Sequence, residues 1–168
     1  AMAGQGTDPL DGSTAGAWRQ RLATIFRSVM VTRQDYFQVR YIGADGMEIV
    51  RVNRTGDGLE VVRKKDLQDK SAEPYVSAGL KLGKGQIYFS QVTYNRERGA
   101  IDDTFTPTVR TVAPVFDDAG AMLGIIVVNA NYAIMLRNEF AKIAPPYDTF
   151  VVNAGGDFML HKADGHIG

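Results

Sequence analysis

An arginine stands in the middle of each of two segments whose alternating pattern predicts a β-strand. One of them, Arg110, lies between Val109 and Val112, where a charged side chain is rarely buried without a partner. Its guanidinium can hold a carboxylate through two parallel hydrogen bonds. We therefore predict that Arg110 binds a polar or anionic ligand. The alternative is an arginine that points to solvent or pairs with Glu97 or Asp102.

Arg51 has the same kind of position in the strand predicted around residues 47–53. By alternation it shares a face with Ile49 and Asn53, while the residues on either side of it face the other way. The two faces do not differ clearly in apolarity. A solvent-exposed edge is the first interpretation of Arg51, and ligand contact is the second.

Three tyrosines and one asparagine complete the candidate ligand site. Tyr88 and Tyr94 flank the start of the polar segment 93–106, and Tyr75 belongs to a predicted helix that faces it. A tyrosine offers both an apolar wall and a hydroxyl, which suits a small polar ligand, but the same residues also fit an ordinary core. Asn129 interrupts the apolar run GIIVV and is the fourth candidate.

The other reactive residue types do not form a catalytic or cofactor site in the sequence. The chain has 168 residues and no Cys, which excludes thiol nucleophiles, disulfides and Cys-ligated metals. No glycine-rich phosphate-binding motif occurs, and the carboxylates Asp102 and Asp103 lie in a polar segment. A metal site can be drawn in the C-terminal tail, although exposed loop residues are the simpler interpretation of its members, His161, His166, Asp157 and Asp164. We expect no catalysis by this chain, no cofactor and no metal.

The charge balance further narrows the function. With 19 basic and 19 acidic residues the net charge is zero, which argues against a nucleic-acid-binding surface. The run Arg63-Lys64-Lys65 is most simply a solvated face, and contact with anionic lipid or a partner is its alternative. The 45% of apolar residues is enough for a folded core.

The elements that must position these residues follow from periodicity. Residues 1–12 resemble a tag or linker, and the spacing of Trp18, Leu22, Ile25, Phe26 and Val29 predicts a helix over 13–32 with Ser13 as its N-cap. The remaining pattern predicts a hairpin over 36–53, a helix over 71–82, a strand over 86–92, a hairpin over 108–131, a helix over 132–142 and a last hairpin in the tail. Strands joined mostly by hairpins indicate an α+β fold, an antiparallel sheet with helices packed on it.

Four segments in this order resemble a known family. YFQVRYIGADGMEIVRVNR, DLQDKSAEPYV, GQIYFSQVTYNRERGAI and PTVRTVAPVFDDAGAMLGIIVVN are similar to the membrane-distal half of a double Cache (PAS-like) sensor domain. The subgroup is the extracytoplasmic input domain of bacterial sensor histidine kinases and diguanylate cyclases. The resemblance assigns residues 13–143 to the distal module and residues 144–168 to the truncated start of the membrane-proximal module.

The resemblance implies a periplasmic piece of a membrane-anchored receptor. Its pocket would lie between the sheet and residues 71–106, take a small polar or anionic ligand, and signal through the N-terminal helix. The sequence departs from the amino-acid-binding subfamily, because Asn129 stands where an Asp is found and the helix SAEPY lacks Arg and Trp. The alternative is a module without its own ligand that forms a homodimer through the stripe Trp18, Leu22, Ile25 and Val29, or docks a periplasmic binding protein.

Overall fold

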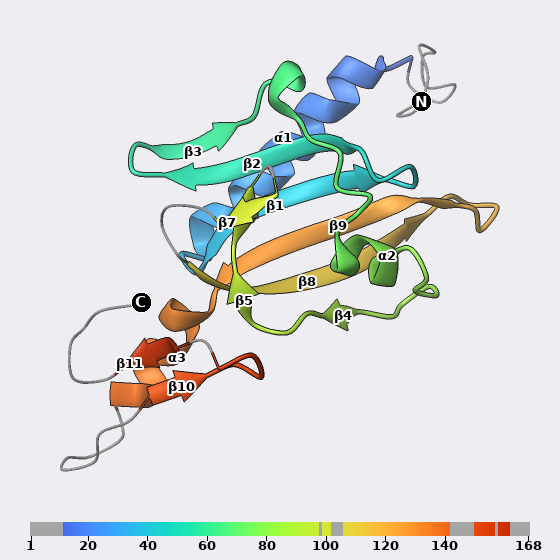
Figure 1. Ribbon diagram of the computed structural model, residues 1–168. Helices are drawn as coiled ribbons and strands as arrows, with labels where there is room; N and C mark the ends of the chain where they lie inside the picture. The colour runs from blue at the N-terminus through green and yellow to red at the C-terminus, as the bar shows by residue number, and fades with distance from the viewer. Residues whose placement is uncertain (1–11, 98, 102–105, 142–149, 157, 162–168) are drawn as a thin grey trace.

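A seven-stranded sheet in the order β3-β2-β1-β9-β8-β4, with β5 also paired to β8, forms the centre of the molecule (Figure 1). It is seen in a computed structural model that describes residues 12–97, 99–101, 106–141, 150–156 and 158–161. The elements are α1 (Ala15–Thr32), β1 (Tyr36–Gly43), β2 (Glu48–Thr55), β3 (Gly58–Val61), the 3-10 turn η1 (Lys64–Asp66), α2 (Pro74–Gly79), β4 (Tyr88–Phe89), β5 (Thr93–Tyr94), β6 (Arg96–Glu97), β7 (Ala100–Ile101), β8 (Pro107–Phe116), β9 (Met122–Asn131), α3 (Tyr132–Ala141), β10 (Phe150–Val152) and β11 (Phe158–His161).

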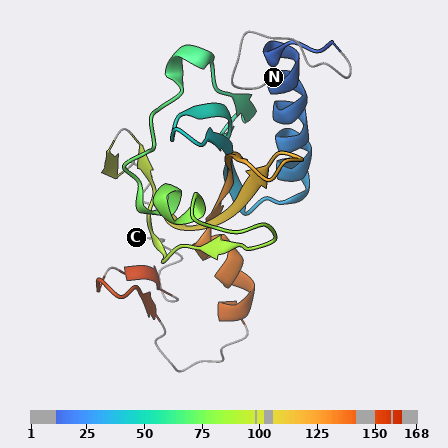
Figure 2. The same ribbon diagram turned by 90° about the vertical axis from the view of Figure 1, so that its right-hand side faces the viewer.

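The two long hairpins predicted from alternation are present. β1 pairs with β2 and β8 pairs with β9, in both cases antiparallel. The pairing of β1 with β9 joins the two hairpins into one sheet across a large sequence separation. The α+β prediction is therefore confirmed, and the sheet has two faces that different helices cover (Figure 2).

Helix α1 covers one face of the sheet. Ala23, Phe26 and Met30 on the helix pack against the apolar face formed mainly by β1, β2 and β9. The predicted stripe is only partly buried, because Ile25 and Val29 are 56% and 42% exposed and point away from this core. The predicted cap is also wrong: Thr14, not Ser13, is the N-cap, and its hydroxyl accepts a hydrogen bond from the Ala17 amide.

Helix α2 lies on the opposite face, together with the chain that leads to it. Tyr75 and Val76 pack on Val112 and on neighbouring residues of β9. The helix is shorter than the predicted 71–82, because Pro74 occupies its first turn and Glu73 is its N-cap. At Gly79 the backbone approaches β8 so closely that a Cβ would lie 2.5 Å from Cγ1 of Val112. Glycine is required there by this close approach.

The segments that follow α2 differ from the single strand predicted over 86–92. Two short strands, β4 and β5, each pair with β8 at separate places. The predicted polar segment then contains a small hairpin of β6 and β7. It lies beside the α2 face of the sheet and carries Glu97 (Figure 1).

The C-terminal part begins with α3, which confirms the helix predicted after β9. β10 and β11 form a separate two-stranded sheet, as the predicted tail hairpin required. Asn153 of this part donates a hydrogen bond to the Val92 carbonyl at 3.3 Å. Among the described residues, no helix is both long and apolar enough to cross a bilayer.

Candidate functional site

The α2 face of the sheet carries a group of buried polar side chains beside its apolar core. We call this group the polar cluster. It consists of Gln38, Arg40, Glu48, Arg51, Lys70, Tyr75, Asn95, Glu97, Arg110 and Asn129, nearly all of them buried. Buried ionisable groups in such numbers are unusual in a core and require partners.

Strand register places the members of the sheet on one face. Arg40 lies directly opposite Arg51 in the β1–β2 pair. Asn129 of β9 lies opposite both Gln38 of β1 and Arg110 of β8. Directly opposed residues of neighbouring strands project to the same side of a sheet. Four strands therefore contribute polar side chains to one continuous surface.

A β-bulge brings Glu48 to this surface. In a regular strand, residues three apart point to opposite faces, so Glu48 and Arg51 would be separated by the sheet. The register shifts between Tyr41 and Ile42, so that Ile42 opposes Glu48 instead of Ile49. The inserted residue reverses the alternation. As a result, the Glu48 carboxylate lies 3.2 Å from Nη1 of Arg51 and 3.3 Å from Nη1 of Arg40.

Glu97 is the centre of the cluster. Its carboxylate accepts hydrogen bonds from the amides of Gln38 and Gln68, both at 2.9 Å. It also forms an ion pair at 3.2 Å with Arg51, and lies 3.9 Å from charged nitrogens of Arg40 and Lys70. Burial alone would raise the pKa of Glu97, but the Gln38 hydrogen bond and the surrounding cations hold this pKa below its usual value.

Tyr75 contacts both Arg40 and Arg110 of the cluster. Its hydroxyl accepts a hydrogen bond from Nη1 of Arg40 at 3.2 Å, and its ring lies under the Arg110 guanidinium at 5.4 Å. Burial raises the pKa of the Tyr75 hydroxyl. Arg110 also donates to the Thr93 hydroxyl at 3.0 Å and to the Tyr94 carbonyl at 3.4 Å. Burial lowers the pKa of Arg110, although an arginine stays protonated at physiological pH.

Three buried polar atoms of the cluster have no hydrogen-bond partner among the residues that the structure describes. They are Nε of Arg40, Nε of Arg51 and Oδ1 of Asn129. The Asn129 amide nitrogen is used, because it donates to Oε1 of Gln38 at 2.9 Å and to Oδ1 of Asn95 at 3.1 Å. Buried polar atoms that stay unpaired are costly and rare, so these three require an explanation, and a bound partner would provide one.

The cluster carries an excess of positive charge. Arg40, Arg51, Lys70 and Arg110 provide four buried cations, while Glu48 and Glu97 provide two carboxylates, so the cluster contains two more cations than carboxylates. The half-buried Glu73, just before α2, offsets part of this excess near Lys70 and Arg110. Burial, followed by repulsion from Arg40, lowers the pKa of Lys70. An additional anion is the chemical species that this arrangement favours.

All six residues predicted to form a ligand site lie on the α2 face of the sheet or beside it. Arg110, Arg51, Asn129 and Tyr75 are members of the cluster, Tyr94 contributes its carbonyl, and Tyr88 packs on the neighbouring apolar core. Two interpretations were wrong. Arg51 is 6% exposed and not solvated, because Glu48 and Glu97 neutralise it, and Glu97 pairs with Arg51 instead of Arg110.

Sequence reasoning missed the other half of the cluster, namely Gln38, Arg40, Glu48, Lys70 and Asn95. Gln38 and Arg40 alternate with apolar residues and therefore resemble the solvent face of a strand. The hairpin turn at 44–46 is no guide to Arg40, because counting back from it in regular register places Arg40 opposite Val50. Only the bulge at Ile42 and Glu48 brings Arg40 opposite Arg51, where the two arginines require acidic partners.

The remaining candidates lie outside the described residues. Asp102, Asp103, Asp157, Asp164 and His166 have no described position, and the side chain of His161 in β11 is not described either. Within the described ranges, no group of three His, Asp or Glu residues is placed to hold a metal ion. The Arg63-Lys64-Lys65 run is exposed, with Arg63 paired to Asp66 at 2.9 Å.

Comparison with known proteins supports the same fold. The model of the family "Bacterial histidine kinase, sensor domain" matches residues 13–167. Solved structures with the fold include the extracellular domain of vpHK1S-Z8, described as a histidine kinase (22% identity, TM-score 0.65, covering 71% of this chain and 43% of that one). A domain of a sensory box/GGDEF family protein from Vibrio parahaemolyticus is similar (22%, TM-score 0.66, 73% and 46%).

A third solved structure is the sensory domain of the Campylobacter jejuni chemoreceptor Tlp3 with isoleucine bound (13% identity, TM-score 0.62, covering 90% of this chain and 54% of that one). The chain thus spans about half the length of these structures. No curated protein matches the sequence.

Proposed function

Because the chain belongs to the family of bacterial histidine kinase sensor domains, we propose that its polar cluster binds a small anionic molecule outside the cytoplasm. The full-length protein would be anchored in the membrane and carry a kinase or cyclase output domain. Ligand binding would change the signal that this output domain receives.

One observation carries the proposal: the environment of the Glu97 carboxylate. Donors from β1, from β2 and from the segment before α2 converge on this one anion, and they include two amides and three cations. The same donors are suited to a carboxylate or a similar oxyanion from solution. A second anion is favoured because the cluster contains two more cations than carboxylates, an excess that the nearby Glu73 offsets only in part.

The unpaired atoms indicate where hydrogen bonds to a ligand would contribute most to binding. Nε of Arg40 and Nε of Arg51 are buried donors for which the described part of the chain supplies no acceptor. Among the described residues, the Arg110 guanidinium donates hydrogen bonds only to neutral oxygens and lies over the Tyr75 ring. A ligand anion near Tyr75 would therefore meet Arg40, which contacts the Tyr75 hydroxyl, and Arg110, which lies over the Tyr75 ring.

The cluster does not favour a zwitterionic amino acid. An α-ammonium group needs an acceptor with negative charge, and both carboxylates of the cluster are already paired with arginines. Asn129 is uncharged, and its amide is engaged by Gln38 and Asn95. Isoleucine is bound by the Tlp3 structure, but we propose a different ligand class for this chain.

Strand β2 offers a route from the site to α1. Arg51 belongs to the cluster, and Arg54, three residues later, donates hydrogen bonds to the carbonyls of Met30 and Arg33 at the C-terminal end of α1. A shift of β2 on ligand binding would therefore move the end of the helix. This supports a relay through α1, which we include in the proposal.

Thermal-shift measurements on the 168-residue chain test the proposal. The panel contains mono- and dicarboxylates, phosphate, sulfate, neutral sugars and amines. We expect a subset of the anions to raise the melting temperature, and Arg110→Gln to remove this response. Arg96→Gln removes an exposed cation of the same region and is the matched control. If no anion stabilises the chain, or if Arg110→Gln responds like the wild type, the proposal is wrong.

A second candidate function is dimerisation through α1. Ile25 and Val29 lie one helical turn apart and are exposed on the side of the helix away from the sheet. Sedimentation equilibrium over a range of protein concentrations checks this candidate. A dimer that Ile25→Glu dissociates supports it, whereas a monomer at all concentrations contradicts it.

A further inference from the structure

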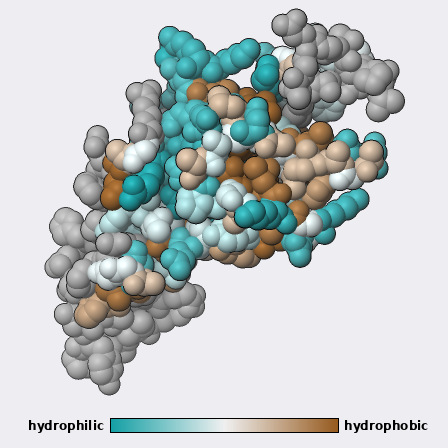
Figure 3. Space-filling view, turned by 45° about the vertical axis from the view of Figure 1, so that its right-hand side comes forward, coloured by the Kyte–Doolittle hydropathy of each residue, from teal (hydrophilic) through white to brown (hydrophobic). Residues whose placement is uncertain are grey.

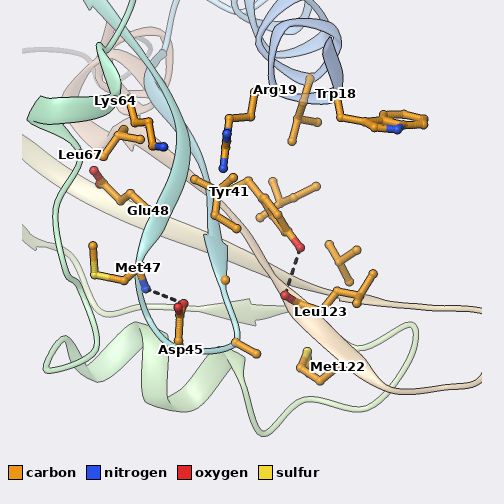
Figure 4. Close-up of a pocket in the computed structure, with 16 residues that line it drawn as sticks. Trp18, Arg19, Tyr41, Asp45, Met47, Glu48, Lys64, Leu67, Met122 and Leu123 are labelled. Carbon is orange, nitrogen blue, oxygen red and sulfur yellow. Dashed lines mark hydrogen bonds between the residues drawn. The ribbon is translucent and has the colours of Figure 1, made fainter. Parts of the chain in front are cut away.

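A cavity of about 830 Å³ lies between the N-terminal part of α1 and the sheet, on the face away from Tyr75 and Arg110. Its walls come from α1, from β1, β2 and the turn between them, from the β8–β9 hairpin, and from the region of η1 (Figure 4). Apolar side chains such as Trp18, Leu22, Ile49, Leu123 and Ile126 form most of the lining. The space-filling view shows apolar side chains gathered around a hollow of the surface (Figure 3). The volume lies within the range of small-molecule sites.

The charged groups of this cavity have unequal roles. Asp45 is engaged by the Met47 amide at 3.0 Å, and Glu48 is paired with Arg40 and Arg51 of the polar cluster. Arg19 and Lys64 line the cavity and form no ion pair within the described residues. Figure 4 shows their nitrogen atoms extending from α1 and from η1 toward the same part of the cavity. Two cations therefore lie together at one end of an apolar space, while the Asp45 carboxylate keeps its negative charge in another part of the lining.

We propose that this cavity binds an alkyl carboxylate, namely a free fatty acid of medium chain length. The chain would lie among the apolar walls, and the carboxylate would lie between Arg19 and Lys64. A neutral apolar ligand would leave both cations unused, and a small polar anion would leave the apolar walls in contact with water. An amphipathic monoanion satisfies both features.

The site differs from that of the proposed polar ligand, although Glu48 belongs to both, and it touches the same signalling element. Trp18, Arg19 and Leu22 belong to α1, and Tyr41 and Ile126 belong to the central strands. A ligand between them would contact the helix directly. The two ligands would therefore act on α1 from different sides of the sheet.

The single Trp of the chain gives a direct measurement. Trp18 lines the cavity, so its fluorescence is expected to change as decanoate binds, at concentrations below those that form micelles. Octanoate should bind more than tenfold more weakly than decanoate, because each buried methylene contributes about fourfold. Decanol tests the apolar part of the site alone, and acetate tests the charged part alone.

Variants separate the two parts. In Arg19→Gln/Lys64→Gln, decanoate binding should weaken at least tenfold while decanol binding stays unchanged, which also verifies that the variant is folded. Leu123→Glu places a negative charge at a half-exposed position of the cavity wall and should weaken the binding of both decanoate and decanol. Arg27→Gln, on an exposed part of α1 outside the cavity, is the control and should bind like the wild type.

Three results would overturn the proposal: no saturable fluorescence change with decanoate, unchanged decanoate affinity in the double variant, or unchanged affinity in Leu123→Glu. None of these depends on whether the polar cluster binds an anion, because the arginine varied there, Arg110, does not line this cavity. Failure of one proposal is therefore distinguishable from failure of the other.

Discussion

Arg40 and Arg51 lie directly opposite each other on β1 and β2, and both are buried. Like charges at directly opposed positions destabilise a sheet unless something neutralises them. Glu48 contacts both guanidinium groups, and Glu97 forms an ion pair with Arg51 and lies within 3.9 Å of Arg40. The pair of arginines therefore depends on one carboxylate from the strand and one from the β6–β7 hairpin.

Removal of the second carboxylate should have two effects. In Glu97→Gln the cations lose a partner, and we expect the free energy of unfolding to fall by about 1–3 kcal/mol. The cost stays moderate because the Glu97 side chain is 29% exposed. Added acetate or sulfate should then stabilise the variant more than the wild type. Chemical unfolding with and without these anions measures both effects.

Glu60→Gln is the matched control for this variant. Glu60 is an exposed glutamate of β3, and its removal should change neither stability nor the response to anions. If Glu97→Gln is as stable as the wild type and shows no added response, the carboxylate does not occupy an anion-binding position.

The lowered pKa of Glu97 predicts that the stability of the fold depends on pH. The folded-state pKa of Glu97 is lowered from the ordinary value of 4.5, so its ionised form stabilises the fold above that pH. This contribution is lost as the pH falls through the folded-state pKa. The stability difference between wild type and Glu97→Gln should therefore be constant near neutral pH and shrink below about pH 4.5. Urea unfolding from pH 3 to pH 7 measures it, and a difference independent of pH would contradict it.

Replacement of Lys70 by an apolar residue should raise the stability of the fold and weaken anion binding. Its ammonium group is buried, and burial lowers its pKa, so the charged form costs free energy in the fold. We expect Lys70→Met to raise the free energy of unfolding by about 1 kcal/mol and to weaken anion binding. Lys65→Met, at an exposed position, is the control. A destabilised Lys70→Met would mean that neutralisation of Glu97 outweighs the burial of the ammonium group.

Gly79 sets the distance between α2 and the sheet. The added methyl group of Gly79→Ala would overlap the Val112 side chain, and we expect a loss of about 1–3 kcal/mol from this overpacking. Displacement of α2 would also move Tyr75 and weaken anion binding. Gly56→Ala is the matched control, because nothing lies within 4 Å of an added Cβ there. Equal melting temperatures of the two variants would show that α2 adjusts without cost.

Much of the fold could be predicted from the chain alone. Alternating apolar residues around the turns at 44–46 and 117–120 predicted both long hairpins, and helical spacing predicted α1 and α3. These signals are local, since a hairpin or a helix is determined by residues close in sequence. The errors occurred where the pattern is short. The helix around Tyr75 is half its predicted length, and of the predicted strand 86–92 only β4 is present, while β5 begins just after it.

The candidate site could be predicted only in part. Arg110 and Asn129 interrupt apolar runs and were visible for that reason. Arg40 and Glu48 were not visible, because a polar residue that alternates with apolar ones has the pattern of an exposed strand face. The bulge at Ile42 and Glu48 leaves no clear mark in the sequence, yet it decides which face Glu48 occupies.

The sequence by itself determined the family, the α+β class and the hairpins, because these depend on periodicity and on segments in a fixed order. Only the tertiary structure decided the chemistry of the site. The charge of the site is the sum of charged side chains that are distant in sequence, from Arg40 to Arg110. Strand register, the bulge in β2 and the β6–β7 hairpin bring these side chains together. A chain with no net charge can thus carry a buried cationic site, because the fold places basic and acidic residues in different parts of the molecule.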